Sequence, residues 1–312
     1  MVSLRAARLI LTVIAVLFIG GCAASPPPLP ADPAAVRAAL STPDFLPGIT
    51  TAQWPDGGRS AADALSWIAT DATSENDEKA TAAGQSAHAV ASYLAQQQLE
   101  LAHIPTGPFN LRKKSLGALN PQLTQGFAHI LEPFQPNLVG DATRTRGFDP
   151  LDATANDHAA ARRVFAVLDT DTAAGTAFNQ AAYRNAEGYL RAFGEDSVRS
   201  PQPDSTPFAY AALLYGVVAG GAELAGNSDI HVYGEQEAAD IAAHTIAAAR
   251  GARPGDLPAK FFTPAGVLMP PDQIPDADRI DYSEQLQLYL SRIPGIAKVI
   301  LRFESLFGQG AG

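Results

Sequence analysis

The amino-acid sequence predicts an all-α protein, an irregular bundle of many helices. From Ala34 onward, apolar residues recur at the three- and four-residue spacing of amphipathic helices, and Pro, Gly and Asp separate these segments. No run alternates apolar and polar residues over a useful length, as an exposed strand would. Charged residues make up only 17% of the chain and alanine is abundant, which favours closely packed helices over a disordered acidic chain.

The first predicted helices lie in the N-terminal third of the chain. Residues 33–40 form a short helix that ends before the turn-like sequence STPDFLPG. Residues 57–72 place Leu65 and Ile68 on one apolar face. Residues 74–98 begin with an acidic turn, which interacts favourably with the positive end of a helix dipole.

A well-marked helix start occurs at Asn120 and Pro121. The Asn120 side chain can cap the free backbone amides of the first turn, and Pro121 occupies the first helical position, where its missing N–H costs nothing. We expect Pro133 to end this helix. Residues 157–193 then form two helices separated by the sequence DTD.

Aspartates in the middle of the chain raise the question of a cation site. Asp169 and Asp171 lie between the two helices of this region. A calcium loop would need more oxygen ligands and a glycine at a set offset, so helix capping is the better interpretation. Asp149 and Asp152 flank a proline and are assigned to a turn.

The C-terminal half contains the most apolar helix. Residues 208–222 are apolar all round, which is typical of a helix buried in the centre of a bundle, and about fifteen residues is short for a membrane span. Residues 234–250 form an amphipathic helix. Residues 255–281 are rich in proline and are assigned to a loop, although 260–269 could hold a small strand pair.

Two short helices are expected at the C-terminal end, over residues 282–293 and 296–307. The second carries Lys298 and Arg302 beside apolar residues, so it could lie on a membrane surface. Its apolar residues crowd more than one face, which favours docking on the domain instead.

Aromatic residues at helical spacing are assigned to the protein core. We expect the polar ends of Trp and Tyr to find backbone partners there, because a buried polar atom without one is costly. The aromatic residues assigned to the core are Trp67, Phe127, Phe165, Phe178 and Tyr215.

The N-terminus has the pattern of an export signal. Arg5 and Arg8 form a basic region, and Leu9 to Ile19 form an apolar region that suits a signal peptide better than a spanning helix. The sequence IGGC that follows resembles the bacterial lipobox. This resemblance implies that Cys22 receives a diacylglyceryl group, that cleavage occurs just before it, and that acyl chains such as palmitate anchor the protein.

Two other interpretations of the leader remain open. Cys22-Ala23-Ala24 could be an ordinary cleavage site that releases a secreted protein, or the leader could stay attached as an anchor. Lipidation is favoured because the lone cysteine has no other evident purpose. We therefore expect a signal peptide over residues 1–21, the lipidated cysteine and a proline-rich spacer over 22–36, and a helical domain over 37–312.

Cysteine count and charge exclude several classes of protein. A single cysteine allows neither an intrachain disulfide nor a Cys-based zinc site. Removing the leader changes the formal net charge from −10 to −12, since Arg5 and Arg8 leave with it. An acidic chain with no dense Lys/Arg block is repelled by nucleic acid, so we expect no nucleic-acid partner.

Five stretches carry a family resemblance: QWPDGGRSAADALSWI (53–68), GQSAHAVASYLA (84–95), LGALNPQLTQGFAHILEPFQPNLVGD (116–141), GFDPLD (147–152) and ARRVFAVLDTDTAAGTAFNQAAY (161–183). Together they resemble the "TPR repeat region" of actinobacterial exported proteins and polymorphic toxins. This resemblance implies a helical module near secreted effectors, commonly in mycobacteria-like bacteria with type VII secretion. It carries over no catalytic residues.

Histidines and nearby polar residues are the candidates for an active site. Ser86 lies near His88, but the spacing turns them apart on a helix and the Gly-x-Ser-x-Gly elbow is absent. Asp240 and His244 share a helix face with Glu237 one turn earlier, yet a solvent-exposed stabilising pair is favoured over a metal site. The six histidines are His88, His103, His129, His158, His231 and His244.

These observations predict a lipoprotein on the outer face of the cell membrane that carries a helical protein-interaction module. We expect a protein partner in the cell envelope, no cofactor and no metal. One alternative is an immunity or accessory protein for an exported toxin, because an acidic surface could mask a basic active site. Another is a hydrolase that acts on envelope components.

Overall fold

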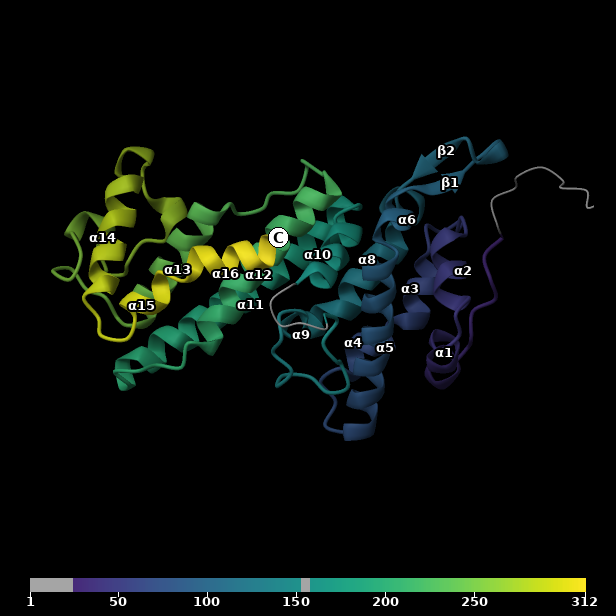
Figure 1. The fold of residues 1–312 in the computed structure, drawn as a ribbon, viewed down its shortest axis with the longest axis horizontal. Coiled ribbons are helices and arrows are strands. Elements are labelled where there is room, and N and C mark those ends of the chain that lie inside the picture. The colour runs from purple at the N-terminus through teal and green to yellow at the C-terminus, as the bar shows by residue number, and fades with distance from the viewer. Residues whose placement is uncertain (1–24, 153–157) are drawn as a thin grey trace, which may run out of the picture.

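The computed structural model describes residues 25–152 and 158–312, which form an elongated helical bundle with one two-stranded sheet (Figure 1). The predicted all-α class is confirmed. Cys22 and the predicted signal peptide lie outside the described residues. The helices are α1 Pro33–Leu40, α2 Phe45–Thr51, α3 Arg59–Leu65, α4 Trp67–Asp71, α5 Asp77–Gln96, α6 Gln98–Ala102, α7 Leu116–Leu119, α8 Pro121–Leu131, α9 Gln135–Leu138, α10 Ala159–Leu168, α11 Thr172–Arg199, α12 Thr206–Ala225, α13 Glu235–Ala249, α14 Arg279–Ser291, α15 Ala297–Ile300 and α16 Phe303–Ala311.

The core runs continuously along the molecule. Helix α12 packs against α10, α11 and α16, while α10 also contacts α5 and α8 also contacts α3 and α11. Most of the buried apolar side chains of these helices belong to one hydrophobic cluster. Helices α1 to α3 lie at one end of the long axis, and α13 to α15 lie at the other (Figure 1).

Helix α12 is the predicted central helix. Among the described residues it is the one helix long and apolar enough to cross a membrane, and most of it is buried inside the fold. The helix is longer than the apolar run because Pro207 can occupy its first turn without losing a hydrogen bond, and Gly226 ends it with a left-handed backbone conformation.

The C-terminal segment docks on the domain, as its apolar pattern favours. Phe303, Leu306 and Phe307 of α16 are buried against the core. The single helix expected over residues 296–307 is broken into α15 and α16. The crossing of α16 over α12 is close, because a Cβ added to Gly216 would lie 2.1 Å from the carbonyl oxygen of Phe307.

Helix α2 in the N-terminal third was not predicted. Helix α2 covers part of the sequence assigned to a turn, with Pro47 near its start. It was missed because STPDFLPG contains the residues that usually mark turns. The segment expected over 57–72 is divided into α3 and α4.

The prediction that Asn120 caps α8 is wrong. It precedes α8, but its side chain makes no hydrogen bond to the first turn of that helix. Instead, Asn120 Nδ2 donates to the carbonyl oxygens of Thr50 (3.1 Å) and Ala52 (2.8 Å), and Oδ1 accepts from the Trp54 amide (3.2 Å). The amide therefore satisfies the C-terminal end of α2. Pro121 does occupy the first position of α8, as predicted.

The proline-rich segment after Ser25 differs from a free spacer. Pro27 lies against Gly48 of α2, and Leu29 packs against the hydrophobic core. Helix α1 begins at Pro33, inside the range expected to be linker, with the Asp32 side chain accepting from the Ala35 amide at 2.9 Å. The helical domain thus extends back to about the start of the described chain.

Two other segments are irregular. A short antiparallel hairpin, β1 Ile104–Thr106 and β2 Arg112–Lys114, was not predicted because each strand has only three residues. The proline-rich stretch before α14 is a loop with single 3₁₀ turns, as expected. Within it the Met269 amide donates to the Phe261 carbonyl oxygen (2.9 Å), which gives one isolated bridge rather than a strand pair.

Candidate functional site

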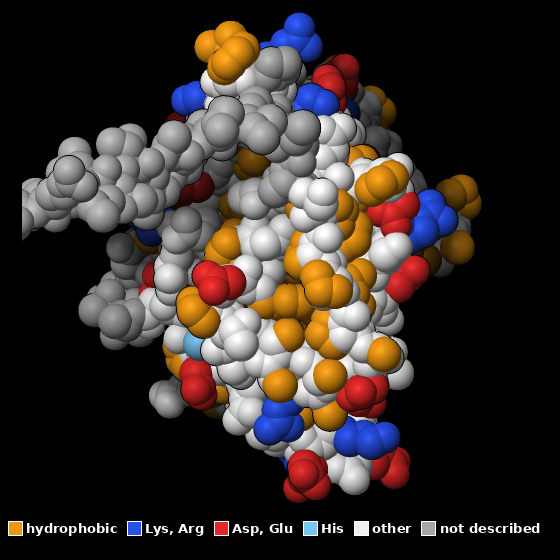
Figure 2. Space-filling model, turned by 90° about the vertical axis from the view of Figure 1, so that its right-hand side faces the viewer, with side chains coloured by type: hydrophobic (Ala, Val, Ile, Leu, Met, Phe, Trp, Pro, Cys, Tyr) orange, Lys and Arg blue, Asp and Glu red, His pale blue; other side chains and the backbone are white. Residues whose placement is uncertain are grey.

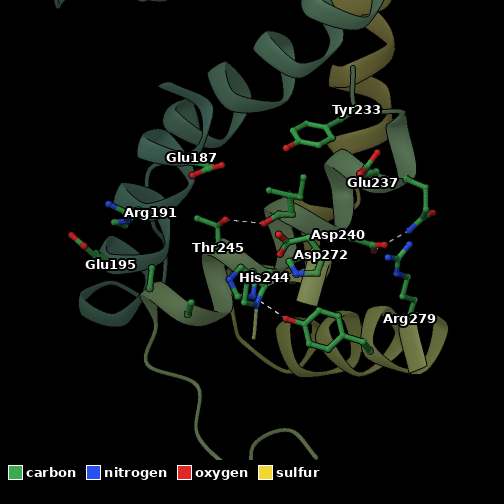
Figure 3. A pocket seen from close by; sticks show the side chains of 17 residues that line it. Glu187, Arg191, Glu195, Tyr233, Glu237, Asp240, His244, Thr245, Asp272 and Arg279 are labelled. Atoms are coloured by element: carbon green, nitrogen blue, oxygen red, sulfur yellow. Dashed lines mark hydrogen bonds between the residues drawn. The ribbon is translucent and has the colours of Figure 1, made fainter. Parts of the chain in front are cut away.

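A groove of about 940 Å³ lies at the end of the molecule formed by α11, α13 and the segment that leads into α14 (Figure 3). Glu187, Arg191 and Glu195 project from the C-terminal half of α11. Glu237 and Asp240 of α13, with Asp272 of the loop, line the other side, and His244 lies between (Figure 3). These elements are distant in sequence, and only the folded chain brings their side chains together.

His244 is held in a defined protonation state. The Tyr282 hydroxyl donates to the Met269 carbonyl oxygen (2.5 Å), so its oxygen must accept the proton of His244 Nδ1 (2.8 Å). Burial lowers the pKa of His244 to about 4, although Asp272 favours the protonated form. The imidazole is therefore neutral at pH 7, and its Nε2, which bonds to no described residue, is a hydrogen-bond acceptor.

Asp240 and His244 do not form the exposed pair expected from the sequence. Both are partly buried, and each is hydrogen-bonded across to α14 rather than to the other. Asp240 accepts from Ser283 Oγ (2.5 Å) and from Gln236 Nε2 (3.1 Å). Within residues 25–152 and 158–312, no group of three His, Cys, Asp or Glu side chains is placed to hold a metal ion.

The groove carries more negative than positive charge. Five carboxylates line it, against the guanidinium groups of Arg191 and Arg279. Arg279 is already occupied, since it forms an ion pair with Asp276 (3.1 Å) and donates to the Ile274 carbonyl oxygen (3.4 Å). Carboxylates and a neutral imidazole offer acceptors, so the lining is complementary to a ligand with cationic hydrogen-bond donors.

Ser86 and His88 are turned apart on α5, as their spacing predicts. Ser86 is buried and donates to the Ala82 carbonyl oxygen (2.8 Å), which is an ordinary bond within α5. The His88 ring lies edge-on to Phe148, with ring centroids 5.4 Å apart, and contacts Ser92 rather than Ser86. His103 and His129 are exposed and do not line the groove, and His158 is buried. His231 is exposed beside the groove, with its ring edge-on to that of Tyr233 and the ring centroids 5.4 Å apart.

The two central aspartates have different roles. Asp171 caps α11, accepting from the Ala174 amide at 2.8 Å, as predicted. Asp169 does not cap that helix: it ends α10 and is completely buried, with Oδ1 accepting from Asn179 Nδ2 at 3.1 Å. Burial raises the pKa of Asp169 to about 7, and its Oδ2 has no hydrogen-bond partner among the described residues. Asp152 caps the start of α10 through the Ala160 amide (3.0 Å).

The aromatic core is present, but not every polar end is satisfied. Phe127, Phe165, Phe178 and Tyr215 are buried and Trp67 is half-buried. The expectation of backbone partners is wrong for two of them, since Trp67 Nε1 and Tyr215 Oη have no hydrogen-bond partner in residues 25–152 and 158–312.

The sequence signalled only part of the groove. Glu237, Asp240 and His244 were singled out from their spacing on one helix, whereas Glu187 and Asp272 come from segments with no local motif. Comparison with protein-family models, curated proteins and solved structures finds no significant match.

Proposed function

We propose that this chain is a lipid-anchored protein of the cell envelope whose helical domain binds a basic segment of another protein. The acidic groove between α11, α13 and the α14 loop is the observation that supports this proposal most strongly. Its carboxylates would pair with Lys or Arg side chains, and the neutral His244 would accept a further hydrogen bond. The rigid, continuous core would hold the groove in shape without a partner.

The anchor would orient the groove away from the membrane. Four residues lie between Cys22 and Pro27, which packs against α2, so the five residue steps of this tether can span at most about 18 Å. A lipid on Cys22 would therefore keep the α1–α3 end of the molecule close to the bilayer. The groove lies at the opposite end of the long axis, where a partner could reach it (Figure 1).

A second candidate is an immunity or accessory protein for an exported toxin. The same carboxylates favour it, because an acidic groove could cover a basic active site. The hydrolase alternative has less support, since Ser86 is engaged within its own helix and His88 faces Phe148.

Crosslinking in living cells, followed by pulldown and quantitative mass spectrometry, tests the binding proposal. The groove variant Glu187→Gln/Glu237→Gln/Asp272→Asn removes three carboxylates that make no side-chain hydrogen bond within the described chain. We expect it to reduce recovery of the wild-type partners at least about 10-fold, because charged hydrogen bonds each contribute about 1.5–3 kcal/mol.

The matched control Asp63→Asn/Glu100→Gln/Glu223→Gln changes the net charge equally at exposed positions outside the groove. It should recover the same partners as the wild type. Equal recovery by the groove variant, or equal loss in the control, would rule out the groove as the binding surface.

A further inference from the structure

The β1–β2 hairpin projects from the helical bundle at the end of the molecule that includes α2 (Figure 1). It leaves α6, pairs Ile104 with Lys114 and Thr106 with Arg112, and returns to α7. Its base is tied to the domain, since Ile104 is buried. Its tip is formed by the single turn η1 Pro108–Asn110.

The tip exposes large apolar side chains. Phe109 and Leu111 are each 81% exposed, and Leu99 of the neighbouring α6 is 69% exposed. Phe109 also has a φ of 60°, a left-handed conformation that aromatic residues rarely adopt. Neither burial nor backbone preference favours phenylalanine at this position, and such outliers cluster at functional sites.

Three consecutive basic residues follow the apolar tip. Arg112, Lys113 and Lys114 are exposed, and none forms an ion pair with a described residue. No Asp or Glu occurs between Glu100 and Glu132, in a chain with 32 acidic residues. These three residues are the longest run of Lys and Arg in the chain. Figure 2 shows hydrophobic side chains flanked by Lys and Arg at the top of this end of the molecule.

We propose that the hairpin docks on an anionic lipid bilayer. Phe109 and Leu111 enter the boundary between headgroups and acyl chains, and the basic residues of β2 contact lipid phosphates. Nucleic acid is a poor alternative, because the remainder of the chain is strongly acidic and three basic residues neutralise few phosphates.

The position of the hairpin agrees with the tether, a point that rests on the proposed lipid anchor. Thr50 of α2 bonds to the Tyr93 hydroxyl in the C-terminal half of α5 (2.7 Å), and the hairpin follows directly after α5 and α6. Pro27 lies on the same α2. The anchor and the hairpin would therefore engage one membrane surface, and two contacts would fix the orientation of the domain.

Vesicle co-sedimentation tests this docking without the lipid. The protein is residues 22–312 with Cys22→Ser, which contains every described element, and the vesicles are phosphatidylcholine with or without 30% phosphatidylglycerol. We expect binding to the anionic vesicles only, reduced at least about 10-fold by Arg112→Gln/Lys113→Gln/Lys114→Gln, because each cation near an anionic surface contributes to attraction.

A second variant tests the apolar tip. Phe109→Asn/Leu111→Gln removes both exposed apolar side chains and places at position 109 a residue that tolerates positive φ. It should also weaken binding to the anionic vesicles about 10-fold. The control Arg199→Gln/Arg253→Gln/Arg292→Gln removes the same charge at the other end of the molecule and should bind like the wild type.

Absence of binding, equal binding to neutral vesicles, or equal loss in the control would overturn the proposal. These results are independent of Cys22. An unlipidated cysteine with intact vesicle binding would contradict the anchor alone, whereas a lipidated cysteine without vesicle binding would contradict the hairpin alone.

Discussion

Replacing Gly216 by alanine is expected to lower the free energy of unfolding by about 3 kcal/mol. The added Cβ would lie 2.1 Å from the Phe307 carbonyl oxygen and 2.9 Å from the Gly310 Cα. Both neighbours are backbone atoms, so no side chain can rotate away, and α16 would have to move off α12. That movement would expose Phe303 and Leu306, which are buried in the native fold.

Gly188→Ala in α11 is the matched control, measured by urea denaturation beside Gly216→Ala. Gly188 lies in the middle of a helix, and a Cβ there meets nothing within 4 Å. Alanine at this position should be neutral or stabilise the protein by up to about 1 kcal/mol, because glycine lowers helix propensity. If both variants were equally stable, the close crossing of α12 and α16 would be refuted.

Asp169→Asn is expected to raise the free energy of unfolding at pH 8 by up to about 4 kcal/mol. Burial raises the pKa of Asp169 from 3.8 to about 7, so the folded protein retains a proton that the unfolded chain has released. The wild type therefore loses stability as pH rises from about 4 to 7. An asparagine at this position stays neutral throughout and keeps an oxygen to accept from Asn179 Nδ2.

The effect should depend on pH in one direction. Below about pH 4 the carboxyl is protonated in both states, so Asp169→Asn and the wild type should have similar stability. The difference should grow up to about pH 7 and then level off. Asp171→Asn, two residues away, keeps a capping oxygen and should change the free energy of unfolding by less than about 0.5 kcal/mol. A flat difference for Asp169→Asn between pH 4 and 8 would contradict the buried carboxyl.

Local patterns predicted the elements whose causes are local. The all-apolar run produced α12, and Asp171 supplied the cap that precedes α11. Asn120 also has the local pattern of a helix cap, but its side-chain amide donates to two carbonyl oxygens at the C-terminal end of α2. This contact joins segments that are distant in sequence, so local patterns could not predict that Asn120 would bond to α2 and not cap α8.

The groove and the hairpin could be predicted from the sequence only in part, because both depend on contacts between segments that are separated in the chain. His244 was visible as part of a helical face, but its neutral state depends on Tyr282 and Met269, which follow after a proline-rich loop. The hairpin strands are too short to show alternation, so the sequence did not predict that three basic residues lie in a strand next to an exposed apolar tip. A strand of three residues is too short to show the two-residue periodicity of a β-strand. Such a strand is defined by its pairing with another strand across a turn.

The lipid on Cys22 is the central claim, and mass spectrometry of the native protein from the membrane fraction tests it most directly. We expect an N-terminal peptide that begins at Cys22 and carries a diacylglyceryl group, together with alkyne fatty-acid labelling that is lost in Cys22→Ala. An unmodified residue 22, or a protein found entirely in the cytosol, would contradict it.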